Sequence, residues 1–335
     1  MKTVPEISVI IPVYNVEKFL PQALDSLLSQ TFADFEAVCV NDGSSDNCAE
    51  ILAAYASKDS RLRIISRNNQ GVSAARNAAL DVAQGNYIVF LDPDDLIHVR
   101  FLEIMLEQIK RTNADFVWCD TIRFNDVGAD VNAPLSNQRR SLFIDDLPER
   151  FILQKRPCPK AALWDKIFKA ELFNHLRFET NVYVAEDFIL MLSLLRKARN
   201  AVYINAALKY YRVRKDSLMH AGLTEKYVAG HITAYFLLKS RCAELSLSEK
   251  AEKILARRLT KMLYRACLCS PYKKARQNEI VFQFWEKYST VLAQMARNKE
   301  FDLSLLDFKK RCLMRLFLRK KFKLLNFFLK IQRLK

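Results

Sequence analysis

The sequence has 335 residues, of which 50% are hydrophobic and 27% are charged, with 53 basic residues against 37 acidic ones. This composition is typical of one large or two ordinary globular domains, and it excludes a wholly disordered or fibrous chain. The net charge of +16 is compatible with a nucleic acid, an anionic membrane surface or phosphorylated ligands.

The first 120 residues alternate between strand and helix patterns. Apolar runs predict strands over residues 7–11, 35–40, 63–65, 87–91 and 116–119, the first of them ended by Pro12, and helical spacing predicts helices over 19–28, around 52–55, over 73–83 and over 101–110. This alternation predicts βαβ crossovers and a mostly parallel sheet. Because such sheets bind ligands at the carboxyl ends of their strands, we expect the polar loops 14–15, 41–46 and 92–95 to converge on one edge.

The remaining chain divides by pattern and by charge. Residues 124–145 are polar and irregular, which indicates a variable loop, and a helix over 186–199 and strands over 201–204 and 209–213 follow. After residue 220 only helical periodicity is present. Residues 1–220 hold 27 basic and 28 acidic residues, whereas residues 221–335 hold 26 and 9. We therefore predict a domain boundary near residue 220, between a near-neutral body and a basic helical region.

Several common motifs and targeting signals are absent. The sequence has no GxGxxG, GxxxxGK[ST], GxSxG or HExxH, which argues against dinucleotide-binding, Walker-type, serine-hydrolase and zinc-protease sites. It has no apolar run of about 18 residues and no signal-peptide core, so we expect neither a transmembrane helix nor secretion. The absence of CxxC pairs and of Cys/His clusters favours reduced thiols in a cytoplasmic protein.

Two aspartates, Asp92 and Asp94, directly follow an apolar strand. Carboxylates two residues apart on a turn suit Mg²⁺ or Mn²⁺ bridging a diphosphate, and Pro93 between them stiffens that turn. The alternative is a solvated acidic turn without a ligand. Asp95 is predicted to cap the following segment.

Four motifs occur in a fixed order: VIIPVYN at 9–15, VNDGSSD at 40–46, NQGVSAARN at 69–77 and FLDPDD at 90–95. This set resembles the inverting glycosyltransferases of family two, which have the Rossmann-like GT-A fold. The segments 163–168, 185–187 and 210–217 resemble later parts of that family. The resemblance implies a GT-A catalytic domain over 1–220, with a nucleotide-sugar half at about 1–120 and an acceptor half at about 121–220, followed by a helical region over 221–335. Asn41 departs from the family pattern, where many members have an aspartate.

The resemblance implies a nucleotide site built from the first three motifs. Pro12 and Tyr14 wall the base, with Tyr14 stacking on it. Asp42 accepts a hydrogen bond from the uracil ring, which suits an acceptor-only carboxylate, and Asn69 contacts the base or the ribose. The alternatives from the residues alone are a core tyrosine for Tyr14 and an Asx turn or helix cap for Asp42.

The resemblance also implies the reacting centre. Arg76 reaches the diphosphate, Asp92 touches the ribose and the metal shell, and Asp94 ligates the metal. Asp187 is the general base, and Glu186 either replaces it or positions the acceptor. The alternatives are a surface arginine for Arg76 and stabilisation of a helix N-terminus for the two acidic residues.

Further residues complete the predicted site. Trp164 stacks on an acceptor sugar, with core packing as the equal alternative. Arg212, Arg214 and Ser217 close over the diphosphate. His220 either joins the metal shell or lies on the surface.

The last segment, residues 308–335, has 11 basic residues and no acidic one. Apolar positions interleave with them, namely Leu313, Leu316, Phe317, Phe322, Leu325, Phe328 and Leu329. A basic amphipathic helix of this kind predicts attachment to an anionic membrane. The alternative is a helix packed on the body with a solvated basic face. Nucleic-acid binding is not predicted, because the body has no recognition module.

Together these observations predict a Mn²⁺- or Mg²⁺-dependent inverting glycosyltransferase, peripheral on the inner face of the cell membrane. It transfers a sugar from a nucleotide sugar, a UDP-sugar, to a hydroxyl of a glycan or lipid-linked saccharide in surface-polysaccharide, capsule or lipooligosaccharide synthesis. A homo-oligomer is compatible with the sequence. The alternatives are a catalytically degenerate nucleotide-sugar-binding scaffold and a sugar nucleotidyltransferase. The usual Gly-rich N-terminal loop of the nucleotidyltransferase is absent.

Overall fold

The chain forms two compact units. The N-terminal unit comprises Met1–Thr180 and Glu186–Ser217, and the C-terminal unit comprises Asn181–Ala185 and Leu218–Lys335. The computed structural model describes residues 4–125, 129–135, 141–144, 146–182, 184–213, 225–269, 278–298 and 300–333. The predicted domain boundary near residue 220 lies outside these described residues.

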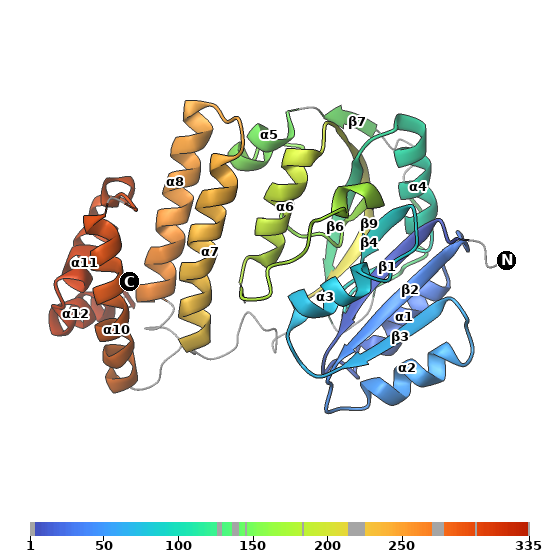
Figure 1. The fold of residues 1–335 in the computed structure, drawn as a ribbon, viewed down its shortest axis with the longest axis horizontal. Helices are drawn as coiled ribbons and strands as arrows, with labels where there is room; N and C mark the ends of the chain where they lie inside the picture. The colour runs from blue at the N-terminus through green and yellow to red at the C-terminus, as the bar shows by residue number, and fades with distance from the viewer. Residues whose placement is uncertain are drawn as a thin grey trace. The chain divides into compact units, whose positions relative to one another are not determined.

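A mixed sheet is the centre of the N-terminal unit (Figure 1). Within the described residues it has nine strands in the order β3-β2-β1-β4-β8-β6-β9-β5, and β7 pairs with β9 outside this path. The strands are β1 Ile7–Val13, β2 Phe35–Asp42, β3 Leu62–Arg67, β4 Tyr87–Phe90, β5 Leu96–Ile97, β6 Phe116–Phe124, β7 Ser141–Ile144, β8 Lys166–Lys169 and β9 Ala201–Arg212.

The first four strands of this order pair in parallel, as the βαβ alternation predicts. Strand β8 then enters antiparallel between β4 and β6, while β6 and β9 are again parallel. The sheet is therefore parallel where the predicted nucleotide motifs lie and mixed beyond β4. All seven residues of β1 are buried, which is the pattern of a central strand covered on both faces.

Helices cover both faces of the sheet (Figure 1). One face packs on α1, α2 and α4 through a single apolar core, and α3 lies against β1 and β2 on the other. The helices of this unit are α1 Leu20–Leu28, α2 Cys48–Ala56, α3 Val72–Leu80, α4 Phe101–Thr112, α5 Leu147–Leu153, the 3₁₀ turn η1 Ala170–Phe173, and α6 Glu186–Lys197.

Three sequence expectations differ from the observed elements. Strand β1 continues through Pro12, because its pairing with β4 ends at Ile10 and no ladder bond is lost on that side. The predicted strands 201–204 and 209–213 are one strand, β9, whose partner β6 has a register irregularity at Asp120. The predicted loop 124–145 contains the short edge strand β7.

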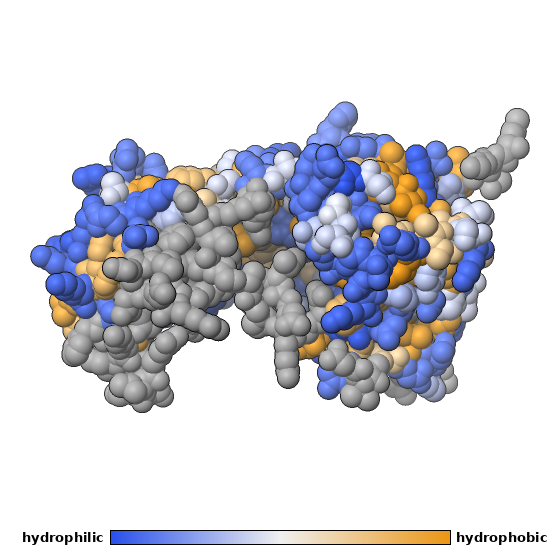
Figure 2. Space-filling model, turned by 90° about the horizontal axis from the view of Figure 1, so that it is seen from below, coloured by the Kyte–Doolittle hydropathy of each residue, from blue (hydrophilic) through white to orange (hydrophobic). Residues whose placement is uncertain are grey.

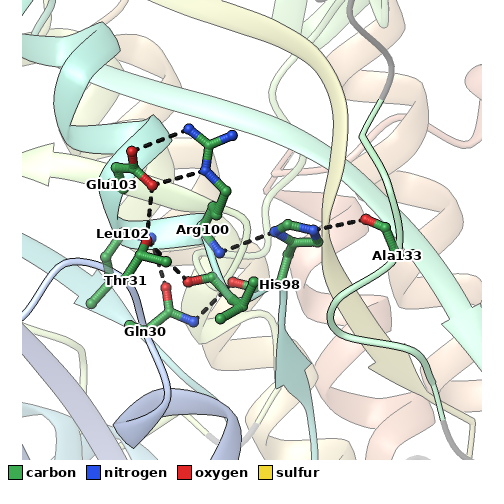
Figure 3. Close-up of polar contacts among 8 residues, drawn as sticks. Gln30, Thr31, His98, Arg100, Leu102, Glu103 and Ala133 are labelled. Carbon is green, nitrogen blue, oxygen red and sulfur yellow. Dashed lines mark hydrogen bonds and ion pairs between the residues drawn. The ribbon is translucent and has the colours of Figure 1, made fainter.

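A polar network fixes the chain after the Asp92–Asp95 turn (Figure 3). The side chain of Gln30, beyond α1, donates to the carbonyl of His98 (2.8 Å) and accepts from the amide of Leu102 (2.9 Å). The His98 ring accepts from the amide of Arg100 through Nδ1 and contacts the carbonyl of Ala133 through Nε2, both at 3.1 Å. The start of α4 is thereby tied both to the end of α1 and to the segment 129–135.

The regular elements of the C-terminal unit are all helices in its described residues. Its elements are α7 Glu225–Ala243, α8 Glu249–Tyr264, the π-helical turn η3 Arg265–Cys269, α10 Asn278–Arg297, the 3₁₀ turn η4 Leu303–Leu305, α11 Phe308–Leu318 and α12 Phe322–Arg333. Trp285 and Phe317 are fully buried in it. Of the helices that the structure describes, none combines the length and the apolar character needed to cross a bilayer.

The basic segment 308–335 is two helices rather than one. A break around Lys320, which has a left-handed φ of 55°, separates α11 from α12. The predicted apolar anchors Leu313, Phe317, Leu325 and Leu329 are buried and form part of the core, while Phe308, Leu324 and Phe328 are exposed. Most of the predicted anchors therefore pack inside the protein.

On the face of the molecule drawn in Figure 2, hydrophobic residues form small patches between hydrophilic ones.

Candidate active site

Arg76 lies at the centre of three carboxylates that come from two other elements. Its guanidinium contacts Asp92, which follows β4, at 3.1 Å, and Asp187 and Glu186 in the first turn of α6 at 2.8 and 3.5 Å. The arginine side chain is 6% exposed, whereas the three carboxylates keep 21–24% exposure. The cluster thus has a buried cation and partly accessible carboxylates.

Helix α3 carries this arginine, and Phe178 covers it. The side-chain amide of Asn77, the next residue along α3, exchanges hydrogen bonds with the backbone of Phe178 at 2.8 and 2.9 Å. The Phe178 ring then lies 5.2 Å from the guanidinium carbon of Arg76. A cation over an aromatic face is stabilised by the ring quadrupole, so Phe178 helps to hold the buried charge.

The electrostatics of the cluster favour a charged arginine and a weakly acidic Asp187. Burial raises the pKa of Asp187 to about 7, and the neighbouring Glu186 and Asp92 add to this rise while Arg76 opposes it. Burial alone would lower the pKa of Arg76, but the charges of Asp187, Asp92 and Glu186 raise it. The pKa of the Asp187 carboxyl consequently lies close to neutral pH.

The loop before α3 is held by Asp42. Its buried carboxylate accepts hydrogen bonds from the amides of Gln70 (3.1 Å) and Gly71 (2.7 Å), and it pairs with Arg67 at 3.2 Å. Gly43, with a φ of 71°, leaves no room for a Cβ, which would lie 2.8 Å from the amide of Asn69. These contacts reach residues 28 and 29 positions further along the chain, so they are neither the Asx turn nor the helix cap that was the alternative for Asp42. Its contact with a base stays a prediction.

The nucleotide residues predicted from the first motif lie at the carboxyl end of β1. Pro12 is buried and Tyr14 is 47% exposed. Asn15 joins this loop to the next. Its side-chain oxygen accepts a hydrogen bond from the backbone N–H of Ser45 at 2.8 Å, and its own backbone N–H donates to the hydroxyl of Ser44 at 3.2 Å. Two of the three polar loops are thus in direct contact, while Asn69 is exposed on the neighbouring loop.

The turn after β4 is held by β9. Asp94 is partly exposed, and its carbonyl accepts from Nε of Arg212 at 2.8 Å. Asp95 does not cap the following segment as predicted: it is buried, accepts from the amide of Arg212 at 2.9 Å and pairs with Lys209 at 3.2 Å. Burial raises the pKa of Asp95 to about 6, although Lys209 opposes the rise.

Trp164 and Arg212 have defined partners. Trp164 stacks on Tyr211 with ring centroids 5.5 Å apart and 20° between the planes. Arg212 is buried, donates to Gln22 at 2.6 Å and lies over the rings of Phe19 and Phe124. The predicted residues Arg214, Ser217 and His220 lie outside the described residues.

Two residues of this region were missed from the sequence. Lys209 is fully buried beside Asp95, and a lysine inside an apolar strand pattern was the available signal. Phe178 covers Arg76 from a segment without regular structure, and no pattern in the sequence indicated that contact.

The described residues contain no cluster of three or more His, Cys, Asp or Glu side chains arranged to hold a metal ion. A cavity of about 500 Å³ lies elsewhere, lined by residues that include Asp115, Lys169 and Arg199. It is at the amino end of β6, whereas the predicted site is at the carboxyl ends of β1, β2 and β4. The cavity is therefore not the predicted site.

Comparison with known proteins identifies a family for this chain. The profile of "Glycosyl transferase family 2" matches residues 8–174. Glycosyltransferase GlyG of Streptococcus pneumoniae serotype 4 is 30% identical over 225 residues, which are 64% of this chain and 72% of the relative. Glycosyltransferase GlyA of the same organism is 30% identical over 306 residues, which are 89% of this chain and 42% of GlyA. The chain thus spans less than half of the length of GlyA.

Among solved structures, S. aureus TarS 1–349 in complex with UDP-GlcNAc superposes with a TM-score of 0.66. The match covers 95% of this chain and 88% of the TarS chain at 22% sequence identity. At this identity the likeness establishes a shared fold.

Proposed function

Because the chain belongs to glycosyltransferase family 2 and has its GT-A fold, we propose that it is a metal-dependent inverting glycosyltransferase. It moves a sugar from a nucleotide sugar, a UDP-sugar, to a hydroxyl of a glycan or lipid-linked saccharide acceptor in surface-polysaccharide synthesis. The observation that carries the proposal is the junction of Asp92 and Asp187 through the buried guanidinium of Arg76. These two contacts support the proposal, because Asp92 belongs to the predicted metal motif and Asp187 is the predicted base.

Asp187 is the proposed general base. A pKa of about 7 lets a carboxylate take the proton of an acceptor hydroxyl near neutral pH, since catalysis is most effective when the pKa is close to the working pH. A single displacement at the anomeric carbon, with the base opposite the leaving group, inverts that centre. Glu186, which shares Arg76 with Asp187, is the alternative base or an acceptor-positioning group.

Asp92 and Asp94 would hold Mn²⁺ or Mg²⁺ at the end of β4. Their carboxylate oxygens are hard ligands that suit either ion. The bound ion would neutralise charge that develops on the leaving nucleotide diphosphate.

The other site residues keep the roles that the family resemblance implies. Pro12, Tyr14 and Asn69 bind the base and ribose, and Asp42 contacts the uracil ring. Arg76 reaches the diphosphate and Trp164 contacts the acceptor. Arg214 and Ser217 close over the diphosphate. For Arg76 and Arg212 this role stays a prediction, because both guanidinium groups already have partners. Arg76 pairs with three carboxylates, and Arg212 donates to the carbonyl of Asp94 and to Gln22.

We also propose that the basic C-terminal region contacts the anionic inner face of the membrane. With Leu313, Phe317, Leu325 and Leu329 in the core, attachment would depend on surface cations together with the exposed Phe308, Leu324 and Phe328. Such attachment is salt-sensitive, because charges at a surface are screened beyond a Debye length.

The test is nucleotide release from a panel of UDP-, GDP- and dTDP-sugars with Mn²⁺, with and without a chelator. We expect release from a UDP-sugar that stops with the chelator and in both Asp94→Ala and Asp187→Asn. Full activity of both variants would refute the site. Nucleotide-sugar binding without turnover on any acceptor would point to the degenerate scaffold, and pyrophosphate release to a nucleotidyltransferase.

A further inference from the structure

Lys209 is a fully buried cation in β9 that no motif or proposed role accounts for. Its side chain has 0% exposure. In the described part of the chain its ammonium group makes no hydrogen bond, but it lies close to a carboxylate and to an aromatic ring. These are the Oδ2 of Asp95 at 3.2 Å and the ring of Trp164, whose centroid is 5.6 Å away.

The Asp95 contact ties Lys209 to the proposed metal motif. Asp95 is the residue after Asp94, and its other oxygen accepts from the amide of Arg212 at 2.9 Å. Arg212 in turn donates to the carbonyl of Asp94 at 2.8 Å. Arg212 and Lys209 of β9 therefore hold the same turn, and Lys209 supplies the positive charge that balances the buried carboxylate of Asp95.

The Trp164 contact ties the same ammonium group to the proposed acceptor end. Trp164 stacks on Tyr211, two residues after Lys209 in β9. Since successive residues of a strand point to opposite faces, Lys209 and Tyr211 lie on one face of the sheet. The indole ring is thus held by two side chains of that face, one stacked on it and one carrying a positive charge.

A neutral residue would not replace this lysine. Removing one partner of a buried ion pair leaves an uncompensated charge, here on a turn that already carries Asp92 and Asp94. An ammonium group near an indole face is attracted by the ring quadrupole, which an apolar side chain cannot reproduce. The ammonium group of Lys209 therefore both neutralises the carboxylate of Asp95 and holds the Trp164 ring.

We propose that Lys209 is a positioning residue that couples the Asp92–Asp95 turn to the Trp164 ring. It thereby fixes the position of the donor end of the site relative to the acceptor end. The assignment of donor and acceptor to these two ends rests on the proposed function. The path Asp95–Lys209–Trp164 itself does not.

The test is a fluorine NMR double-mutant cycle on the full chain, without ligands, with its three tryptophans replaced by 5-fluorotryptophan. Trp164→Phe assigns the Trp164 resonance. We expect Asp95→Asn to shift that resonance when Lys209 is present and to have no further effect in Lys209→Met. Lys209→Arg, which keeps the charge, should restore the response to Asp95→Asn.

A second lysine–aspartate pair of the sheet provides the matched control. Lys169, in β8, pairs with Asp115 at 3.5 Å, at the other end of the strands. Lys169→Met with Asp115→Asn should leave the Trp164 resonance in place. An equal effect of Asp95→Asn with and without Lys209, or an unmoved Trp164 resonance in Lys209→Met, would overturn the proposal. If Lys209→Met alone does not fold, the Asp95→Asn/Lys209→Met variant removes both charges, and its Trp164 resonance is compared with that of Asp95→Asn.

Kinetics provide the second readout. We expect Lys209→Met to raise the acceptor KM roughly 10- to 100-fold, the scale of a small misplacement at a reacting centre. The NMR cycle is independent of turnover. A protein that shows the coupling but transfers no sugar would refute the proposed function and leave the coupling established, whereas active protein without coupling would refute only this inference.

Discussion

The two units of the chain use positive charge in opposite ways. In the N-terminal unit Arg76 and Lys209 are buried; Arg76 pairs with three carboxylates and Lys209 with that of Asp95. In the C-terminal unit Arg315, Arg319 and Lys321 are exposed on α11 and beside it. A buried pair depends on one geometry, because the loss of either partner leaves a desolvated charge. Exposed charges each contribute a small, additive amount to the binding free energy, and salt screens them.

This contrast means that single substitutions should have large effects in the first unit and small, additive ones in the second. The largest effect is expected at the proposed base. Asp187→Asn keeps the size of the side chain but cannot accept a proton, so transfer should fall about 10²- to 10⁴-fold. The measurement is kcat from nucleotide release, with donor binding followed separately by calorimetry.

Asp81→Asn is the matched control for that experiment. Asp81 follows α3 and forms an exposed pair with Arg177, and the same chemical change there should leave kcat as it is. Equal losses in the two variants would show that the chemistry does not depend on the buried cluster.

The second prediction concerns the arginine that joins the cluster. Arg76→Met should lower the free energy of unfolding by about 3 kcal/mol, the lower end for a broken buried pair, since the carboxylates keep 21–24% exposure. Arg100→Met removes an exposed pair with Glu103 and should cost about 0.2–1 kcal/mol. Urea unfolding measures both, and similar costs would contradict the distinction between buried and exposed charge.

The sequence predicted many residues of the site but not the contacts between residues that lie far apart in the chain. The buried runs of β1, β2 and β4 and the polar residues after them follow from local patterns, so the position of Asp92, Asp94 and Tyr14 at one edge was predictable. The pairing of Asp95 with Lys209, 114 positions apart in the numbering, depends on the antiparallel contact of β5 with β9. The burial of Leu313 and Phe317 likewise depends on helices that no local period identifies as neighbours.

The third prediction is the pH dependence of transfer. Asp187 must be deprotonated to act as a base, and burial raises its pKa to about 7. The value of kcat/KM should therefore be constant above about pH 7 and fall up to tenfold per unit below it. A profile that stays flat between pH 5 and pH 8 would argue against Asp187 as the base.

The same pKa affects stability with the opposite sign. Between the ordinary value of 3.8 and about 7, the folded protein holds a proton that the unfolded chain releases. The contribution of Asp187 to the free energy of unfolding should consequently decrease as the pH rises through this range. Comparison with Asp187→Asn isolates this contribution.

The smallest single effects are expected at the basic end of the chain. Arg315→Gln, Arg319→Gln and Lys321→Gln should each weaken binding to vesicles with anionic lipid by about 1 kcal/mol, and the losses should add. Nucleotide-sugar hydrolysis without an acceptor should not change in any of them. Arg257→Gln, an exposed position on α8, removes the same charge elsewhere in the unit, and an equal loss there would mean that charge attracts the membrane from the whole unit. Binding of the wild-type chain that persists in about 1 M salt would instead indicate attachment by the exposed Phe308, Leu324 and Phe328, because at that ionic strength the Debye length is only about 3 Å.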